Sequence, residues 1–466
     1  MRGIVSSAAY LPYGRLDRSQ ITAFIGQGGG TGTRAVASYD EDSTTMAVEA
    51  GRLVLHNHDT APTTVLFGTP FPAYADKTNA TAIHAALRLP IDSLVLDLGA
   101  STRSAVGGFA LALESNAPTL VLSADVRGGL PGSVEEAMGG DAGAALLVAD
   151  DVDGPLIAEF IGRASVTDEF VERWRAPGEI RTKVWDDKFS EVSLVPLGER
   201  AWKRALAQTG LVSSDVAAVA ISAPSQRVGR SLAGKLDGVR VIDDFAGAIG
   251  NSGAAQPALL TAALLEQATS GQVLALVTVA DGADVLLFRA TEALHTYRPV
   301  RPIADQALGG RRITYGKFLS WRNILPVEPP RRPEPQRVSA TAAARNEDWK
   351  FAFVGSKERD SGVVHLPPAR VSRGGARTDE MDPIALADTH GTIVTFTVDR
   401  MAYSPSPPVV FAVVDFDGGG RLPLELTDVN ADEVEIGLRV EMTFRRLYSA
   451  DGIANYFWKG RLMRDG

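Results

Sequence analysis

The sequence predicts an α/β structure that is followed by a small all-β barrel. Over roughly the first 320 residues, short apolar runs alternate with longer helical patterns, which is typical of sheets covered by helices on both faces. A proline-rich stretch, PVEPPRRPEP at 326–335, then interrupts this alternation and predicts an extended spacer. Residues 391–465 alternate in period two without a long helical pattern, as the strands of a small barrel do.

The predicted strands of the α/β part are short, apolar and bounded by glycine, proline or aspartate, as buried strands are. They are TTVLFG at 63–68, TLVLSA at 119–124, AALLVA at 144–149, VAAVAIS at 216–222 and VLALVTVA at 273–280. Helical patterns between them include DSTTMAVEAGRLVLHN and LGERAWKRALAQTG. The barrel strands are expected in GTIVTFTVDRM, PPVVFAVVDFDGG, RLPLELT, LRVEMTFRRLY and NYFWKGRLM.

Composition and charge exclude several classes of protein. With 45% hydrophobic and 22% charged residues among 466, the chain has an ordinary globular composition. Its longest apolar runs fall far short of the roughly 20 residues that cross a bilayer, and residues 1–25 lack the pattern of a signal peptide. We therefore expect no membrane association and a cytoplasmic location. The net charge of -9 argues against nucleic-acid binding, which needs clustered lysine and arginine.

Six segments of the first part carry a family resemblance. They are GIVSSAAYLPYGRL near the start, YDEDSTTMAVEAGR at 39–52, GTPFPAYADKTNAT at 68–81, GGDAGAALLV at 139–148, ISAPSQRVGRSLAGKL at 221–236 and IGNSGAA at 249–255. Together they resemble the 3-hydroxy-3-methylglutaryl-CoA synthase branch of the thiolase superfamily, especially its archaeal form, with ketoacyl-ACP synthase III as a more distant relative. The resemblance implies a thiolase-like, duplicated five-layer α-β-α-β-α fold with halves at 1–165 and 166–325.

The C-terminal part carries a second resemblance. The segments VVHLPPARV, GTIVTFTV, PPVVFAVVDFDGGGRL and IGLRVEMTF resemble an acyl-CoA-associated family that joins a rubredoxin-like zinc ribbon to an OB-fold. This resemblance implies a linker at 326–345, a ribbon region at 346–380 and an OB-fold at 381–466.

The nucleophile of the synthase family is missing. LDLGASTRSAVGGFALAL at 96–113 resembles the turn in which a strand ending in small residues delivers a cysteine to the start of a buried, glycine-containing helix. The chain has no cysteine, and with Gly107 and Gly108 kept in register the family position reads Ala105, with Ser104 as the nearest hydroxyl. Because a thiolate forms the acyl-enzyme in that family, we expect the covalent step to be absent.

Other catalytic positions of the family have also changed. The resemblance places Pro70 at the family's glutamate, the general acid/base, and Ser222 at its histidine, which holds the second acyl-CoA. Asn251, in the turn GNSG, is retained. Each lost role is typically worth about 100-fold or more in rate, so no condensing activity of the family type is expected.

The ribbon positions lack zinc ligands. The family binds zinc through two CxxC pairs, a thiolate signature, whereas the matching positions here are Glu358 with Ser361 and Ser372 with Gly375. His365 is the single soft ligand nearby. We therefore expect no zinc, and a ribbon region that persists as a metal-free hairpin.

Two functions of different class follow from these resemblances. In the families concerned, the OB-fold protein and the synthase or thiolase are separate chains that assemble with a cysteine-bearing thiolase and share a CoA tunnel. In this sequence the two parts are fused in one chain. The first function is therefore that of a pseudoenzyme, which acts as an accessory or scaffold subunit. It is expected to form a homodimer through TLVLSADV, to bind a cysteine-bearing thiolase-type subunit, or both.

The alternative is an enzyme that acts on acyl-CoA without cysteine, by aldol or retro-aldol chemistry. In that case Asn251, Ser222, Ser104 and Tyr74 would line the site as polar donors. Binding of CoA is an open question in both cases. Arg227 follows the family's histidine motif and is either a contact for CoA phosphates or a solvated helix-start arginine.

Overall fold

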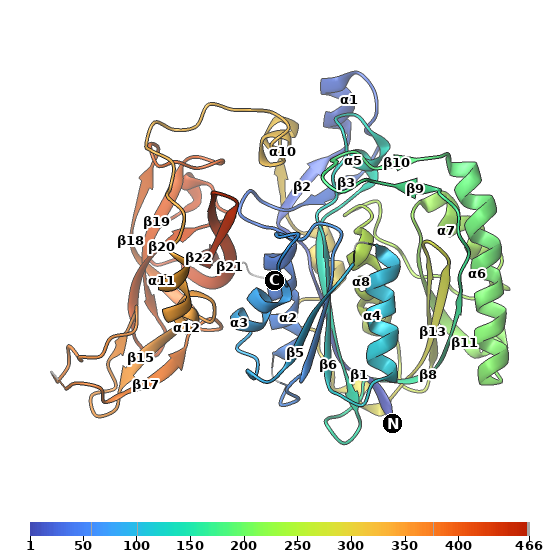
Figure 1. Cartoon of the computed structure of the whole chain (residues 1–466), viewed down its shortest axis with the longest axis horizontal. Helices are drawn as coiled ribbons and strands as arrows, with labels where there is room; N and C mark the ends of the chain where they lie inside the picture. The colour runs from blue at the N-terminus through green and yellow to red at the C-terminus, as the bar shows by residue number, and fades with distance from the viewer. Residues whose placement is uncertain (57, 100, 376, 464–466) are drawn as a thin grey trace. The chain divides into compact units, whose positions relative to one another are not determined.

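The computed structural model describes residues 1–56, 58–99, 101–375 and 377–463, which form two compact units (Figure 1). The first unit comprises Met1–Ala37, Glu49–Thr81 and Leu89–Phe318. The second comprises Ser38–Val48, Ala82–Arg88 and Leu319–Gly466, of which 464–466 lie outside the described residues. None of the helices in the described ranges combines the length and apolar character that crossing a membrane requires.

The first unit is built on a nine-stranded sheet with the order β11-β12-β13-β8-β1-β7-β6-β4-β5. Its strands are β1 Arg2–Tyr10, β4 Thr64–Gly68, β5 Leu94–Leu98, β6 Thr119–Asp125, β7 Ala142–Asp150, β8 Ala158–Val166, β11 Val216–Ser222, β12 Val273–Val279 and β13 Ala283–Ala290.

The same pattern of parallel and antiparallel strand pairs occurs in both halves of this sheet. In the first half, β1 pairs with β7 and β7 with β6 in antiparallel fashion, and β6–β4 and β4–β5 are parallel. In the second half, β8–β13 and β13–β12 are antiparallel and β12–β11 is parallel, and an isolated parallel bridge from Val219 to Val241 stands where a fifth strand would lie. The halves meet where β1 pairs with β8. This repeat is the duplication that the resemblance implies.

The helices repeat with the strands. They are α2 Ser43–Leu55, α3 Ala80–Ala86 and α4 Thr102–Glu114 in the first half, and α6 Asp187–Thr209, α7 Gln226–Ala233 and α8 Gln256–Glu266 in the second. Helices α4 and α8 hold equivalent places and contact each other and the sheet, whereas α6 packs on β8 and β13 at the outside of this unit (Figure 1). Every residue of α8 except Glu266 is buried, as expected for a helix that is apolar on all sides.

Shorter elements complete this part of the chain. A three-stranded sheet has the order β14-β2-β3, and β9 pairs with β10 in a small hairpin. The bounds are β2 Gly14–Asp17, α1 Ser19–Ile25, β3 Thr33–Val36, α5 Val134–Met138, β9 Arg173–Trp174, β10 Lys183–Val184, η1 Ser213–Asp215, η2 Gly253–Ala255, η3 Glu292–His295, α9 Ile303–Leu308, β14 Arg311–Ile313 and α10 Tyr315–Trp321.

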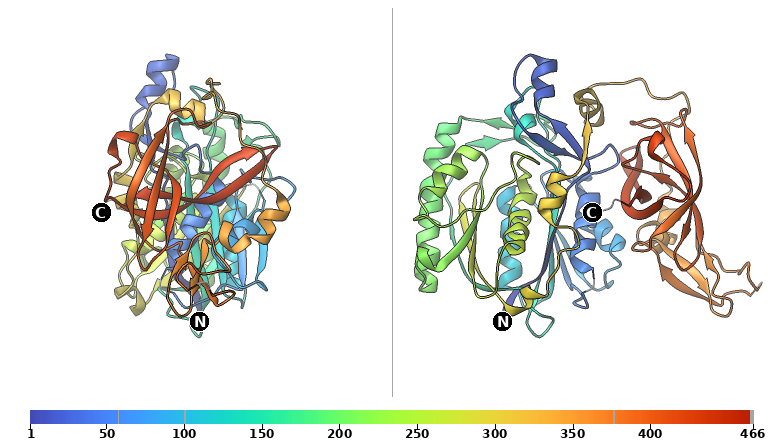
Figure 2. Two further views of the ribbon diagram at one scale, coloured as in Figure 1. Left: turned by 90° about the vertical axis from the view of Figure 1, so that its left-hand side faces the viewer. Right: turned by 180° about the vertical axis from the view of Figure 1, so that it is seen from behind.

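The second unit contains a closed five-stranded barrel with the order β18-β19-β20-β22-β21 (Figure 2). Neighbouring strands are antiparallel except β20 and β22. Alternate residues of β19, from Val410 to Phe416, are buried, as the period-two pattern predicts. The strands are β18 Gly391–Asp399, β19 Val409–Phe416, β20 Arg421–Leu426, β21 Arg439–Ala450 and β22 Ile453–Leu462, with η4 Ala431–Glu433 between β20 and β21.

The region before the barrel forms a small sheet with the order β16-β15-β17. Its strands are β15 Val354–Glu358, β16 Val364–His365 and β17 Met381–Ala385, and they follow α11 Ala340–Arg345 and α12 Glu347–Lys350. Helix α11 lies inside the range expected as a linker, because the Ser339 side chain caps an alanine-rich segment. Since β17 pairs with β15, this sheet extends past the expected end of the ribbon region at residue 380.

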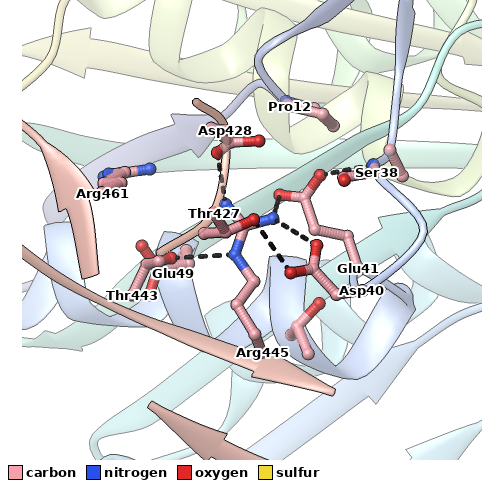
Figure 3. A network of polar contacts seen from close by, with 12 residues as sticks. Pro12, Ser38, Asp40, Glu41, Glu49, Thr427, Asp428, Thr443, Arg445 and Arg461 are labelled. Carbon is pink, nitrogen blue, oxygen red and sulfur yellow. Dashed lines mark hydrogen bonds and ion pairs between the residues drawn. The ribbon is translucent and has the colours of Figure 1, made fainter. Parts of the chain in front are cut away.

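Buried charges join the segment 38–48 to the barrel strands within the second unit (Figure 3). The Arg445 guanidinium lies 2.8 Å from Glu41 and 3.4 Å from Asp40. The Lys459 ammonium is 3.0 Å from Asp40, which also accepts a hydrogen bond from Thr427. Burial raises the pKa of Asp40, but the two cations outweigh it and lower the pKa to about 2. The motif at 39–52 thus supplies acidic groups to the second unit.

Candidate functional site

A cavity of about 200 Å³ lies at the carboxyl ends of four strands of the first unit. Pro70 follows β4, Asp125 ends β6, Ser222 ends β11 and Ala280 follows β12, and all four line the cavity. Strands β4 and β6 are parallel, as are β11 and β12, and the carboxyl ends of both pairs contribute lining residues, so segments far apart in sequence converge here. Of the positions identified from the sequence, Pro70, Ser222 and Asn251 line this cavity together.

The start of α4 also borders the cavity. Ser101 is in the extended conformation and its hydroxyl accepts the N–H of Ser104, which is a normal N-cap, so the helix begins at Thr102. Ser101 and Thr102 line the cavity. Ala105 is 6% exposed, lies one turn further along the helix against Gly68, and is not among the lining residues. Thr102 is therefore the first residue of α4 and borders the cavity, whereas Ala105, the position that the resemblance assigns to the nucleophile, lies one turn inside the helix.

Asn251 uses both ends of its amide to hold the cavity wall. Its Nδ2 donates to the carbonyl of Ala223, 2.8 Å away, and its Oδ1 accepts the N–H of Gly253 at 2.9 Å. Ser222, next to Ala223, is 2% exposed. The retained asparagine thus ties the end of β11 to the turn that leads into α8.

Three other predicted positions lie away from the cavity. Tyr74 is not among its lining residues, and its backbone N–H donates to the Asn79 side chain. Ser104 is likewise outside the lining, 3.4 Å from the Ser101 hydroxyl. The guanidinium of Arg227 is 53% exposed and pairs at 2.6 Å with Glu191, which favours the reading of this residue as a solvated helix-start arginine.

A segment between β8 and α6, residues 167–186, covers the cavity and carries β9 and β10. Its Arg175 donates to the carbonyl of Pro70 and lies 3.7 Å above the centre of the Phe71 ring, a cation–π contact. Arg173 pairs with Glu135 of α5. These contacts attach the segment to the loop after β4 and to α5.

Two buried carboxyl groups belong to the cavity wall. Asp125 has no exposed surface, and its Oδ2 accepts the N–H of Ala254 at 3.1 Å and faces Arg127 at 3.4 Å. Glu172, in the covering segment, is 5% exposed and accepts a hydrogen bond from the Ser190 hydroxyl. Burial raises the pKa of both carboxyl groups above their usual values.

Reasoning from the sequence missed both carboxyl groups. Asp125 carried a usable signal, since it follows directly on the predicted strand TLVLSA. Glu172 lies in an irregular segment without a motif, so its place could be found only from the structure.

The ribbon positions hold one another through hydrogen bonds. The buried Glu358 carboxylate accepts the N–H of Ser361, 2.7 Å away, and also the Ser361 hydroxyl. Ser372 lies 3.4 Å from the His365 imidazole and accepts the N–H of Gly374. Gly375 offers no ligand atom beyond its backbone.

Carboxylate oxygens of Glu358, Asp360 and Glu380 lie within 4.8 Å of one another. Arg377 pairs with two of these three groups, with Asp360 at 2.6 Å and with Glu380 at 2.9 Å. A tetrahedral zinc site of the ribbon type needs four soft ligands, and the described residues of this region do not fit one.

The strand expected at a dimer interface is internal. TLVLSADV corresponds to β6, which pairs with β4 on one side and with β7 on the other, so it cannot pair with a second chain. The sheet instead ends at β5, where the side chains of Leu94 and Leu96 are 56% and 43% exposed. Any strand addition at this end of the sheet would therefore use β5.

Both parts of the chain are similar to known proteins. Residues 384–445 match the family described as the C-terminal OB-fold domain of ChsH2. A DUF35 domain-containing scaffold protein of Methanocaldococcus jannaschii is 26% identical over 115 residues, which cover 24% of this chain and 81% of that protein.

The first part aligns with archaeal enzymes. Hydroxymethylglutaryl-CoA synthase of Methanocaldococcus jannaschii is 30% identical over 38% of this chain, and the alignment spans only 55% of that synthase. The synthase of Pyrococcus furiosus is 25% identical, with coverage of 67% of this chain and 93% of the enzyme. A crystal structure of HMG-CoA synthase complexed with CoA has a TM-score of 0.59 at 16% identity, covering 68% of this chain and 89% of that one. This last likeness shows the fold.

Proposed function

Since the chain is an HMG-CoA synthase-like protein of the thiolase superfamily with a C-terminal OB-fold domain of the ChsH2 type, we propose that it binds acyl-CoA without forming an acyl-enzyme. In this proposal it is an accessory or scaffold subunit of a complex that processes acyl-CoA. The observation that carries the proposal is a cavity at the strand ends in a chain that contains no thiol.

The residues around the cavity support the loss of covalent chemistry. A hydroxyl such as that of Thr102 is a weak nucleophile unless an adjacent base takes its proton. The family's histidine position is Ser222, and Asn251 has both ends of its amide engaged. Among the described residues, no hydrogen bond joins the Thr102 hydroxyl to Ser222, to Asn251 or to a carboxyl group of the cavity wall, so acyl transfer to the chain is not expected.

The similarity of the C-terminal part supports a role in assembly. The relative from Methanocaldococcus jannaschii is named a scaffold protein. We infer that this chain assembles with a cysteine-bearing thiolase-type subunit, with itself, or with both, and that β5 is the strand available for self-association.

Coexpression with a cysteine-bearing thiolase-type protein from the same organism tests the assembly. The two proteins should copurify, and condensation of acyl-CoA should require the cysteine of the partner. The matched control replaces that cysteine by alanine, which should abolish turnover while leaving the complex intact. A solitary protein that forms no complex would contradict the proposal.

Binding of acyl-CoA can be measured separately by calorimetry with acetyl-CoA and CoA. The solved synthase with CoA supports this ligand. Because Arg227 is paired with Glu191 outside the cavity, Arg227→Ala should leave the affinity unchanged. Arg175→Ala removes a cation from the cavity wall and should weaken binding. Absence of binding by the unmodified chain would contradict the proposal.

A second function is supported by the two buried carboxyl groups. Asp125 and Glu172 are candidates for proton transfer in a cavity without a thiol, as aldol or retro-aldol cleavage of a 3-hydroxyacyl-CoA requires. The test is turnover of 3-hydroxyacyl-CoA substrates by the purified chain, repeated with Ser222→Ala. No turnover, with or without a partner, would remove this second function.

A further inference from the structure

Glu172 is a carboxyl group placed in the cavity by a segment that the repeated halves of the fold do not share. It belongs to the segment 167–186, between β8 and α6, and lines the cavity while being 5% exposed. The Ser190 hydroxyl at the start of α6 donates to its Oε2. Its Oε1 accepts no hydrogen bond from any residue that the structure describes. One oxygen is therefore fixed and the other is available to a ligand.

The position of this segment explains how the cavity regains a carboxyl group. Position 70, where the resemblance places an acid/base, is a proline, and Arg175 of the segment donates to the carbonyl of Pro70. Glu172 and Pro70 line the same cavity of about 200 Å³. A carboxyl group thus reaches this space from a different part of the chain.

The charged groups around Glu172 do not cancel the tendency of its carboxylate to accept a proton. Arg173 attracts its carboxylate but also pairs with Glu135, and Asp281 and Glu135 add charge of the same sign as Glu172. The Ser190 hydrogen bond holds the carboxylate in one orientation. A buried carboxylate that is oriented by a hydroxyl and lacks a dedicated cation is suited to accept a proton.

Asp125 has a different role. Its Oδ2 is held by the N–H of Ala254 and by Arg127, and its Oδ1 is buried without a partner among the described residues. The residue has no exposed surface, so Asp125 is a positioning residue for the turn that follows Asn251.

We propose that Glu172 is the base that removes a proton from the carbon next to the thioester carbonyl of an acyl-CoA bound in this cavity. The inference rests on the second function above. In the step, the carbon–hydrogen bond breaks, its electron pair forms the enolate of the thioester, and the proton moves to the Glu172 carboxylate. Return of a proton from Glu172 to the same carbon restores the acyl-CoA, so no other reactant is needed.

Exchange of these protons with deuterated water measures the step directly. Acetyl-CoA and butyryl-CoA are incubated with the full chain in deuterium oxide, and deuterium at the α-carbon is followed by mass spectrometry. Glu172→Gln should slow the exchange by about 100-fold or more, since general-base catalysis is typically worth that much. Glu169→Gln, an exposed glutamate in the same segment, is the matched control and should exchange at the unmodified rate.

Further variants distinguish a catalytic role of Glu172 from a structural one, and failure of this proposal from failure of the proposed function. Glu172→Asp should restore part of the rate, whereas a purely structural role would give no rescue, and thermal unfolding verifies that each variant folds. Loss of exchange in Asp125→Asn together with full exchange in Glu172→Gln would overturn the proposal. Acyl-CoA that binds without any exchange would also overturn it while leaving the accessory function standing. Absence of binding would instead contradict the proposed function.

Discussion

Thr102 and Ala105 are three positions apart in the sequence but occupy different environments. Keeping Gly107 and Gly108 in register placed the family nucleophile at Ala105, because glycines were the anchors that the sequence offered. The structure starts α4 at Thr102, since Ser101 supplies the N-cap. The absence of a thiol holds for either position.

Because the chain has no cysteine, a single introduced thiol can report on the environments of positions 102 and 105. Thr102→Cys and Ala105→Cys each introduce a single thiol into the chain. The thiol at 102 lies at a helix N-terminus on the cavity wall and should react with a small disulfide reagent about tenfold faster or more. Both variants should unfold at temperatures near that of the unmodified chain. Faster reaction at position 105 would show that the helix start is assigned wrongly.

At the scale of elements, apolar runs located the strands well. VAAVAIS and TLVLSA became β11 and β6, and the five alternating segments became the barrel strands, because short buried strands carry a strong pattern. Strand order did not follow from the pattern, so the internal strand β6 was assigned to a dimer interface. The strand before the nucleophile turn, at LDLGA, was expected, but its edge position as β5 was not, and the segment 167–186 has no distinctive periodicity.

The ribbon region provides a prediction about metal. Hydrogen bonds from Ser361 to Glu358 and the ion pairs of Arg377 stabilise the sheet β16-β15-β17 without a zinc site. A chelator such as EDTA should therefore leave the thermal unfolding of this region unchanged. Hydrogen exchange of the β15 amides before and after chelation measures this, and loss of protection after chelation would show that a metal ion contributes.

At the scale of the whole molecule, the second unit depends on acidic residues from the N-terminal part of the sequence. Asp40 is buried between Lys459 and Arg445, so Asp40→Asn removes a carboxylate that the two buried cations share, while Glu425 and Glu41 remain beside them. Breaking a buried pair completely typically costs about 3–5 kcal/mol. The free energy of opening, measured by hydrogen exchange of the β21 and β22 amides, should therefore fall by an amount up to that value.

The exposed pair of Asp415 and Arg421 provides the matched control. Asp415→Asn should lower the free energy of opening much less than Asp40→Asn, because surface ion pairs contribute little. The pKa of Asp40 is lowered from 3.8 to about 2, so its stabilising contribution is complete above pH 3.8 and is lost as the pH falls towards 2. Equal effects of the two substitutions would contradict a stabilising role for the buried network.

The central claim is that the chain holds acyl-CoA in its cavity without a covalent step. Mass spectrometry of the chain incubated with acetyl-CoA tests this most directly, with native and denaturing spectra recorded from the same sample. We predict a complex with acetyl-CoA in the native spectrum and the mass of the unmodified chain after denaturation. A stable acetyl adduct on the denatured chain, or no complex in the native spectrum, would contradict the claim.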